Sequence, residues 1–191
     1  MNYILEKDKR KMRLKQIDFR SDWKKIKKLY KRAFPRFERK PLWIVRMKHK
    51  KGEADIWVLE HDEEFVGFAI TINELDMVLL DYFAVCENLR SGGLGSQALK
   101  LLQEKYADKR FFLEIECEDE TAKNAAERVR RKEFYLRNGM SELGVKANVY
   151  TVDMELLGYN CEVSFKDYEQ LYYASYGNMI AGNIVEKERM I

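Results

Sequence analysis

Residues 89–102, LRSGGLGSQALKLL, place one arginine and three glycines within seven positions and then continue as an apolar helix pattern. Glycines between a strand and a helix let the backbone approach a ligand closely. The N–H groups of the first helical turn lack intrahelical acceptors, and the helix dipole favours an anion beside them. The stretch therefore predicts a site for a phosphate or a pyrophosphate.

Two other phosphate motifs fit this stretch less well. A P-loop ends in Gly-Lys-Ser or Gly-Lys-Thr, whereas Ser-Gln-Ala follows the last glycine here. GLGSQA at 93–98 does match the dinucleotide pattern GxGxxA, and Glu114 and Glu116 follow about twenty residues later. However, residues 86–91 separate the predicted strand from these glycines, and too few βαβ units follow for a doubly wound sheet.

Hydrophobic periodicity around the stretch predicts a mixed α/β fold (α+β, mixed sheet) rather than repeated βαβ units. The turns HDEE and NELD join three successive strand patterns, which favours an antiparallel meander. The predicted elements are a strand at 12–19, helices at 21–34 and 42–47, strands at 54–60, 64–72 and 77–85, a helix at 94–106, a strand at 110–117, a helix at 124–138, two strands within 141–157 and a final helix carrying Tyr168 to Tyr176.

Capping residues support several of these boundaries. Ser21 is the expected N-cap of the first helix, and the pair Asn138-Gly139 is a favoured C-cap. Ser164 and Asp167 form the pattern of a capping box before the final helix. The loop 35–41 between the first two helices holds both prolines of the chain.

Composition indicates one soluble globular domain with a modest appendage. The chain has 191 residues, 46% of them hydrophobic, and no apolar run near the ~18 residues that a membrane span needs. The N-terminus does not resemble a signal peptide. Three scattered cysteines argue against a disulfide framework and favour a reducing compartment, so a cytoplasmic protein without membrane contact is expected.

The net charge of +3 conceals a strong asymmetry. Residues 1–51 contain 20 Lys and Arg against 5 Asp and Glu, whereas the remainder is acidic. A basic segment can bind nucleic acid, but it can also be a solvated helix face that pairs with the acidic remainder. Because the segment has no recognised nucleic-acid motif, no nucleic-acid partner is expected.

A second motif gives the glycine stretch its context. Arg90-x-x-Gly93-x-Gly95 resembles the R/Q-x-x-G-x-G/A signature of the GNAT superfamily of N-acetyltransferases. Members of that superfamily share the predicted order of elements and a later helix that ends in Tyr-x-x-x-Gly, which appears here as YLRNGM at 135–140. The resemblance covers roughly residues 12–157. It implies a GNAT-type fold, in which a central, mostly antiparallel sheet with two splayed strands is flanked by helices, and it implies acetyl-CoA as cosubstrate.

The resemblance also implies which residues hold acetyl-CoA. In the superfamily the pyrophosphate binds to the amides of the glycine loop, and the pantetheine arm pairs with the backbone of the preceding strand. The corresponding residues of this chain are Phe83, Ala84 and Val85 on the strand and Arg90, Ser91, Gly92, Gly93, Gly95 and Ser96 on the loop.

Roles in chemistry follow the same resemblance. Tyr135 occupies the position of the acid that protonates the departing thiolate, although it could simply pack beside Phe134. Arg128 and Arg131 stand where many members carry Asn and Ala, and share one helix face with Tyr135. We hypothesise that they reach a CoA phosphate, the alternative being solvated charges.

The strand at 110–117 offers two candidates for the general base. Glu116 is the first candidate for binding or deprotonating the amine and Glu114 the second. The alternatives for Glu116 are an exposed edge or a salt bridge with the basic N-terminal region. No residue pattern suggests a metal site.

The sequence thus predicts a GNAT domain at 1–157 and a helical extension at 158–191, packed on that domain or at a homodimer interface. The tail tyrosines are expected to pack or to form a dimer contact. The predicted function is acetyl transfer from acetyl-CoA to a primary amine of a small molecule or protein. The alternative is a non-catalytic CoA-binding or scaffold module of the same fold. We expect the acceptor amine to be recognised by loop 35–41, the first two helices and the tail.

Overall fold

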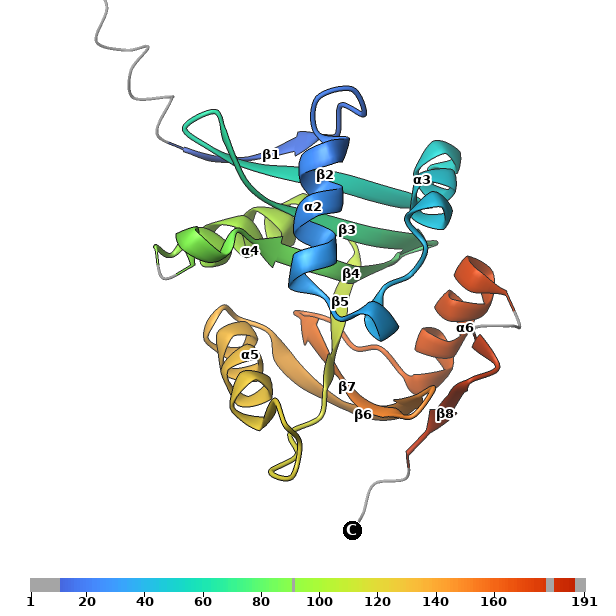
Figure 1. Cartoon of the computed structure of the whole chain (residues 1–191). Helices are drawn as coiled ribbons and strands as arrows, with labels where there is room; N and C mark the ends of the chain where they lie inside the picture. Colours follow the sequence, from blue (N-terminus) through green and yellow to red (C-terminus); the bar gives the residue numbers. More distant parts are fainter. Residues whose placement is uncertain (1–10, 91, 178–180, 188–191) are drawn as a thin grey trace, which may run out of the picture. The chain divides into compact units, whose positions relative to one another are not determined.

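The computed structural model describes residues 11–90, 92–177 and 181–187 (Figure 1). Hydrogen bonds join its strands in the order β1-β2-β3-β4-β5-β7-β6-β8, and the recorded ladders are antiparallel except for β4 with β5. The chain divides into two compact units, Met1–Ile72 with Asp81–Lys105 and Asn73–Leu80 with Tyr106–Ile191. The predicted fold class, a mixed and mostly antiparallel sheet with helices, is confirmed.

The first unit is a meander of strands with helices on both faces. Its elements are β1 (Met12–Gln16), α2 (Trp23–Ala33), a 3-10 helix (Arg36–Glu38), α3 (Leu42–Lys51), β2 (Ala54–His61), most of β3 (Glu64–Glu74), the second half of β4 (Met77–Val85), a 3-10 helix (Glu87–Leu89) and α4 (Leu94–Lys105).

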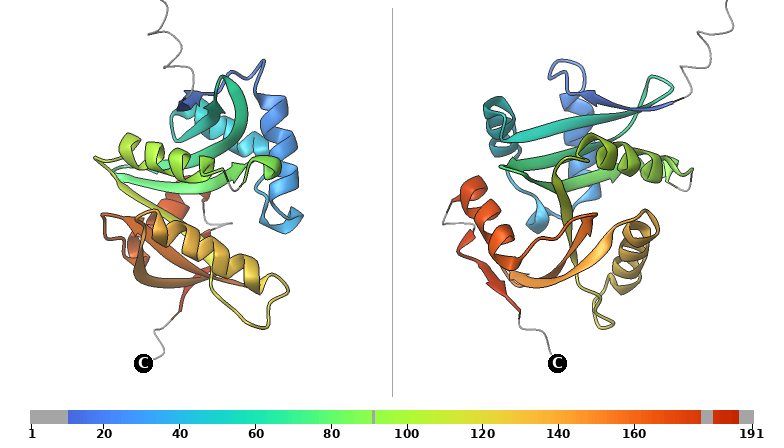
Figure 2. Two further views of the ribbon diagram at one scale, coloured as in Figure 1. Left: turned by 90° about the vertical axis from the view of Figure 1, so that its left-hand side faces the viewer. Right: turned by 180° about the vertical axis from the view of Figure 1, so that it is seen from behind.

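Alternating apolar residues on β2 divide the core of this unit between the two sheet faces. Val58 packs with Ile26 of α2, whereas the next residue, Leu59, packs with Ala98 of α4. All four side chains are buried, so α2 and α4 lie on opposite faces of the strands (Figure 2).

The second unit is built around β5 (Arg110–Glu116). Its other elements are α5 (Ala125–Arg137), β6 (Ser141–Val149), β7 (Val152–Tyr159), α6 (Phe165–Tyr176) and β8 (Ile184–Glu186). β5 pairs in parallel with the start of β4, from Met77↔Arg110 to Leu79↔Phe112 only, and pairs antiparallel with β7 from Phe111 to Glu116. The β4–β5 ladder therefore ends where β4 passes from the second unit to the first.

Local turn and cap chemistry explains most boundaries. Asp62 and Glu63 both have positive φ, at 55° and 66°, which is the geometry of a tight hairpin between β2 and β3. Asn138 and Gly139 end α5 as expected, with Gly139 at φ 85°. The capping box of Ser164 and Asp167 is confirmed at the start of α6.

The prediction of Ser21 as N-cap is wrong. Asp22 precedes α2, and its carboxylate accepts the backbone N–H of Asp18 at 2.9 Å instead of capping the helix. The Ser21 hydroxyl donates to Asp18 at 3.0 Å, so both side chains stabilise the turn that ends β1. α3 also extends beyond the predicted 42–47, because the first left-handed residue, Gly52 at φ 75°, ends the helix only after Lys51.

The extension 158–191 contains α6 and a short strand, β8, that the sequence analysis did not predict. β8 pairs with β6 through Val149↔Ile184 and its neighbours. α6 buries Tyr168, Leu171 and Tyr172 within the second unit. The division at residue 157 and a role of the tail in a dimer stay predictions.

Candidate functional site

The glycine stretch forms a turn between β4 and α4 in the first unit. The amide of Cys86 donates to the Val66 carbonyl at 2.8 Å, and the 3-10 helix Glu87–Leu89 then reverses the chain. Gly93 has φ 72°, a left-handed conformation that favours glycine, and α4 begins at the next residue. The predicted strand, glycine turn and helix therefore follow one another as expected.

Open space surrounds Gly93. A Cβ built on this glycine would meet no other atom within 4 Å, so the residue is needed for its backbone angle. The first recorded hydrogen bond of α4 joins the Gln97 amide to the Gly93 carbonyl at 3.1 Å. The amides of residues 94–96, which include Gly95 and Ser96, precede that bond and lie in the turn where helix N–H groups lack intrahelical acceptors. Gly92 is exposed, and Ser91 lies outside the described residues.

Arg90 contributes positive charge beside this turn. Its Nε donates to the Val85 carbonyl at 3.3 Å, and the residue as a whole is exposed. The guanidinium of this exposed residue is thus held at the end of β4. A cation here reinforces the preference of the α4 N-terminus for an anion.

The strand before the turn offers its backbone, since its side chains are largely packed. Ala84 is buried in the cluster with Ile26 of α2, and Val85 in the cluster with Ala98 of α4. Phe83 is partly buried beside Val85. The ladder between β4 and β5 ends at Leu79, so residues 83–85 of β4 do not pair with β5.

In the second unit, Tyr135 is a buried tyrosine without a hydrogen-bonded hydroxyl. It is 9% exposed and packs edge-on against Phe134, with ring centroids 5.2 Å apart. No described residue forms a hydrogen bond with its hydroxyl. Burial raises the pKa of Tyr135 to about 12, and the positive charge of Arg131 acts in the opposite direction. The group therefore stays a protonated O–H donor at neutral pH.

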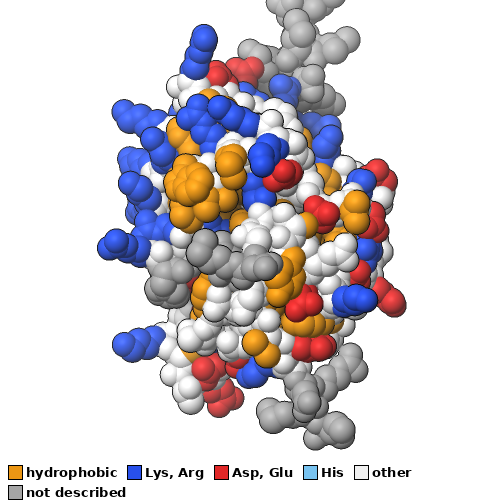
Figure 3. All heavy atoms as spheres, turned by 90° about the vertical axis from the view of Figure 1, so that its right-hand side faces the viewer, with side chains coloured by type: hydrophobic (Ala, Val, Ile, Leu, Met, Phe, Trp, Pro, Cys, Tyr) orange, Lys and Arg blue, Asp and Glu red, His pale blue; other side chains and the backbone are white. Residues whose placement is uncertain are grey.

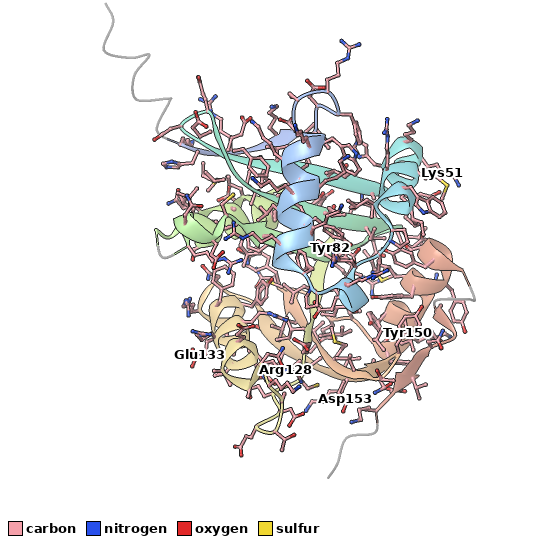
Figure 4. All side chains as sticks on the ribbon, viewed as in Figure 1. Lys51, Tyr82, Arg128, Glu133, Tyr150 and Asp153 are labelled. Atoms are coloured by element: carbon pink, nitrogen blue, oxygen red, sulfur yellow. The ribbon has the colours of Figure 1, made fainter. Side chains whose placement is uncertain are left out.

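Glu116, Arg128 and Arg131 are brought together as an ion-pair network (Figure 4 labels Arg128). The Glu116 carboxylate lies 2.9 Å from Arg128 and 3.1 Å from Arg131, and accepts a third hydrogen bond from Asn124 at 3.1 Å. Arg128 also donates to the Cys117 carbonyl at 2.9 Å.

These contacts rule out both alternatives for Glu116, which were an exposed edge and a salt bridge with the basic N-terminal region. The Glu116 side chain is only 10% exposed, and its cationic partners come from α5. A carboxylate this buried requires cationic partners, and the arginines four and seven residues before Tyr135 supply them. Arg128, 14% exposed, is likewise no solvated charge.

Glu114 has a different partner set, which the sequence analysis missed. Its carboxylate accepts hydrogen bonds from the hydroxyls of Tyr168 and Tyr172, the latter at 2.6 Å. Both tyrosines are fully buried, and their i, i+4 spacing places them on one face of α6. The only sign of this contact in the sequence was the i, i+4 spacing of the two tyrosines, which indicates that they share a helix face. Part of the tyrosine-rich tail therefore has a polar role.

Among the described residues, no group of three or more His, Cys, Asp and Glu side chains is arranged to hold a metal ion. Within the same part of the chain, no helix is both long and apolar enough to cross a membrane.

A mixed, mostly antiparallel sheet in which β4 leads through a glycine turn into α4 defines the class of the fold as α/β. The model of the acetyltransferase (GNAT) family matches residues 23–131, which include the whole turn. This chain belongs to the GNAT acetyltransferase family, and the predicted resemblance is confirmed. A search of curated protein sequences found no match.

Solved structures of similar fold agree with this assignment. A protein from Bacteroides thetaiotaomicron assigned to the GNAT family aligns with a TM-score of 0.72 at 23% identity, covering 86% of this chain and 98% of its own. A chimera of a Vibrio cholerae spermidine N-acetyltransferase aligns with a TM-score of 0.60 at 12% identity, covering 78% and 94%.

A Salmonella typhimurium acetyltransferase that modifies the N-terminal serine of ribosomal protein L7/L12 gives a TM-score of 0.59 at 14% identity, covering 80% and 96%. At such identities these structures show a shared fold alone.

Proposed function

We propose that this chain transfers an acetyl group from acetyl-CoA to a primary amine of a small molecule or a protein. The observation that carries the proposal is the open turn at Gly93, which precedes the first-turn amides of α4 in a chain of the GNAT family. Family members of similar fold include enzymes named for acetylating spermidine and an N-terminal serine. Both acceptors present an amine.

The residues of the first unit would hold the cosubstrate. The amides of Gly93 to Ser96, with the charge of Arg90, fit the two negative charges of a pyrophosphate. Gly92 would belong to the same turn, although its amide donates to the Arg90 carbonyl at 3.1 Å. Backbone groups of Phe83, Ala84 and Val85 would pair with the pantetheine arm, because their side chains are packed away. Ser91 completes the proposed set from the sequence.

The second unit would supply the acid. The amine nitrogen attacks the thioester carbonyl carbon, the carbon–sulfur bond breaks, and the Tyr135 hydroxyl gives its proton to the departing sulfur. The Tyr135 hydroxyl is protonated at neutral pH and has no hydrogen-bond partner among the described residues, so its proton is available to a bound molecule.

Glu116 and Glu114 remain the candidates for taking the amine proton. The engagement of Glu116 with two arginines favours instead a positioning role at the start of α5. The same engagement leaves Arg128 and Arg131 less free to reach a CoA phosphate, which remains a hypothesis.

The decisive experiment follows free thiol while the full chain is incubated with acetyl-CoA and a panel of primary amines. Thiol release that requires an amine, together with the matching gain of one acetyl group on the amine by mass spectrometry, supports the proposal. Tight CoA binding by calorimetry with no thiol release for any amine would favour the alternative, a non-catalytic CoA-binding or scaffold module. A homodimer and a cytoplasmic location stay predictions from the sequence.

A further inference from the structure

The loop between the first 3-10 helix and α3 is fixed on both sides of Arg39. The Tyr82 hydroxyl donates to the Glu38 carbonyl at 2.8 Å and accepts the Lys40 amide at 2.9 Å (Figure 4 labels Tyr82). The Tyr30 hydroxyl donates to the Lys40 carbonyl at 2.9 Å. Both tyrosines are buried, so the backbone that carries Arg39 is held by the core of the first unit.

A buried ion pair fixes the same loop to β4. The Lys40 ammonium lies 2.5 Å from the Asp81 carboxylate, and these side chains are 17% and 2% exposed. Lys40 is therefore committed to the strand, and its charge is balanced there. The preceding residue, Arg39, forms no such ion pair with any residue that the structure describes.

Arg39 carries a buried donor that no described residue satisfies. Its Nε is the one buried side-chain nitrogen or oxygen without a hydrogen-bond partner among the described residues. No carboxylate in that part of the chain forms a salt bridge with its guanidinium, although the more exposed Arg32 pairs with Glu87 at 2.8 Å. An unsatisfied buried donor is costly and is normally explained by strain or by a bound partner. Arg39 has extended φ and ψ of −84° and 117°, so backbone strain is not the explanation.

The surroundings of Arg39 favour a negatively charged partner. Burial raises the pKa of Tyr30 to about 12 while the charge of Arg39 acts against that rise, so the guanidinium lies within electrostatic range of this hydroxyl. α3, which follows the loop, carries no acidic residue in its first turn. Figure 3 shows Lys and Arg side chains gathered on the face that carries α3.

We propose that Arg39 binds a carboxylate of the acceptor, so that the preferred substrates are primary amines that also carry a carboxylate. This inference rests on the proposed acetyl transfer and names its substrate class. The fork of Nε and Nη donors on arginine matches the two oxygens of a carboxylate, which an ammonium group cannot reproduce. Two sources present this chemistry: a free amino acid, through its α-carboxylate, and a peptide that begins with an acidic residue.

The test compares paired acceptors that differ only in the carboxylate. One pair is glycine with glycinamide, and the other is the peptide Asp-Ala-Ala amide with Asn-Ala-Ala amide. For the wild-type protein we expect a KM about 10- to 100-fold lower for the carboxylate member of one pair, the size of one charge-assisted hydrogen bond. The pair that shows the preference identifies the source.

Three variants locate the preference. Arg39→Gln should abolish it by raising the KM of the carboxylate member with little change in kcat, and Arg39→Lys should keep only part of it. Arg36→Gln, an exposed cation three residues earlier in the loop, is the matched control and should retain it. Because Arg39 Nε has no acceptor among the described residues, Arg39→Gln should unfold at a Tm no lower than that of Arg36→Gln.

The outcomes separate this inference from the proposed function. Amine-dependent thiol release without a carboxylate preference, or with a preference that survives Arg39→Gln, overturns the inference and leaves acetyl transfer standing. A Tm of Arg39→Gln well below that of Arg36→Gln also overturns it, because Arg39 would then serve the fold. If no amine releases thiol, acetyl transfer fails, and calorimetric titration of the same four compounds in the presence of CoA decides whether Arg39 binds the carboxylate.

Discussion

The Arg128 guanidinium lies 2.9 Å from the Glu116 carboxylate, and the two side chains are only 14% and 10% exposed. This contact joins the first half of α5 to the end of β5 within the second unit. Since Tyr135 lies two turns further along the same helix, the ion pair also fixes the helix that carries the proposed acid. Arg128 and Glu116, which were expected to act on ligands, therefore contribute to the packing of α5 on β5.

Glu116→Gln tests this structural role. Removing one charge from a buried ion pair leaves its partners uncompensated, so we expect the free energy of unfolding to fall by about 3 kcal/mol. Denaturant unfolding measures the loss. Glu155→Gln is the matched control, since Glu155 is equally buried and lies 2.9 Å from Lys132 in the same unit. At temperatures where both variants are folded, their kcat values should agree; a kcat for Glu116→Gln about 100-fold below the control would make Glu116 the base.

Tyr135→Phe tests the proposed acid. Loss of a general acid lowers kcat by about 100-fold or more, while the Kd for CoA should not change. Stability should be unaffected, because the hydroxyl has no hydrogen-bond partner among the described residues. Steady-state kinetics and calorimetry provide the two measurements, and a variant with full kcat would remove Tyr135 from the mechanism.

Gly93→Ala tests the anion-binding turn against a control with the same backbone. Gly93 and Gly52 have φ of 72° and 75°, and a Cβ at either would meet nothing within 4 Å. Alanine in this conformation costs about 1 kcal/mol at both positions, so the two variants should unfold alike. Only Gly93→Ala should weaken CoA binding, by about tenfold if one phosphate contact is lost. Equal CoA affinities would mean that the turn does not hold the cosubstrate.

Alkaline unfolding should report on two buried tyrosines. Burial raises the pKa values of Tyr30 and Tyr135 to about 12 from an ordinary value of 10.0. Because the folded state then binds the proton more tightly, their contribution to stability is complete below pH 10 and is lost as pH rises toward 12. The free energy of unfolding should therefore decrease between these values, and Tyr30→Phe or Tyr135→Phe should each reduce the slope. An unchanged slope in both variants would contradict the assignment.

Tyr172→Phe tests the polar role of the tail. The hydroxyl of Tyr172 donates to the Glu114 carboxylate at 2.6 Å, and hydrogen bonds to charged groups contribute about 1.5–3 kcal/mol. We expect a stability loss of that size by denaturant unfolding. Tyr173→Phe, which changes the exposed neighbour on the same helix, should have no measurable effect. Equal losses in the two variants would rule out a specific contribution of this hydrogen bond.

Features encoded within a few residues were predictable from the sequence. The capping box of Ser164, the C-cap at Gly139 and the strand, glycine turn and helix around Gly93 each depend on neighbouring residues, and the structure has all three. The family followed from Arg90, the glycines and Tyr135, because their spacing along the chain is itself the signal.

Features that depend on distant partners were not predictable in this way. The start of α2 was misassigned because Asp22, the residue before the helix, does not cap it with its side chain. Its carboxylate instead accepts a hydrogen bond from the backbone N–H of Asp18 in the turn. β8 has only three residues and is defined by its pairing with β6, more than thirty positions away along the chain. The tyrosine partners of Glu114 are 54 and 58 residues further on, and their i, i+4 spacing indicates a shared helix face without identifying the strand residue that this face contacts.

The two units are completed at different times during translation, because the first unit ends at Lys105 and the second continues to the end of the chain. All residues of the first unit precede Tyr106, whereas the second unit takes residues 73–80 from the earlier part of the chain and its strand β8 ends only at Glu186. The open turn at Gly93 and the loop of Arg39 can thus form on the ribosome before β6 and β7 are translated. Since N-terminal units generally fold first during translation, we expect a nascent chain that has cleared the exit tunnel beyond Lys105 to protect the first unit from proteolysis.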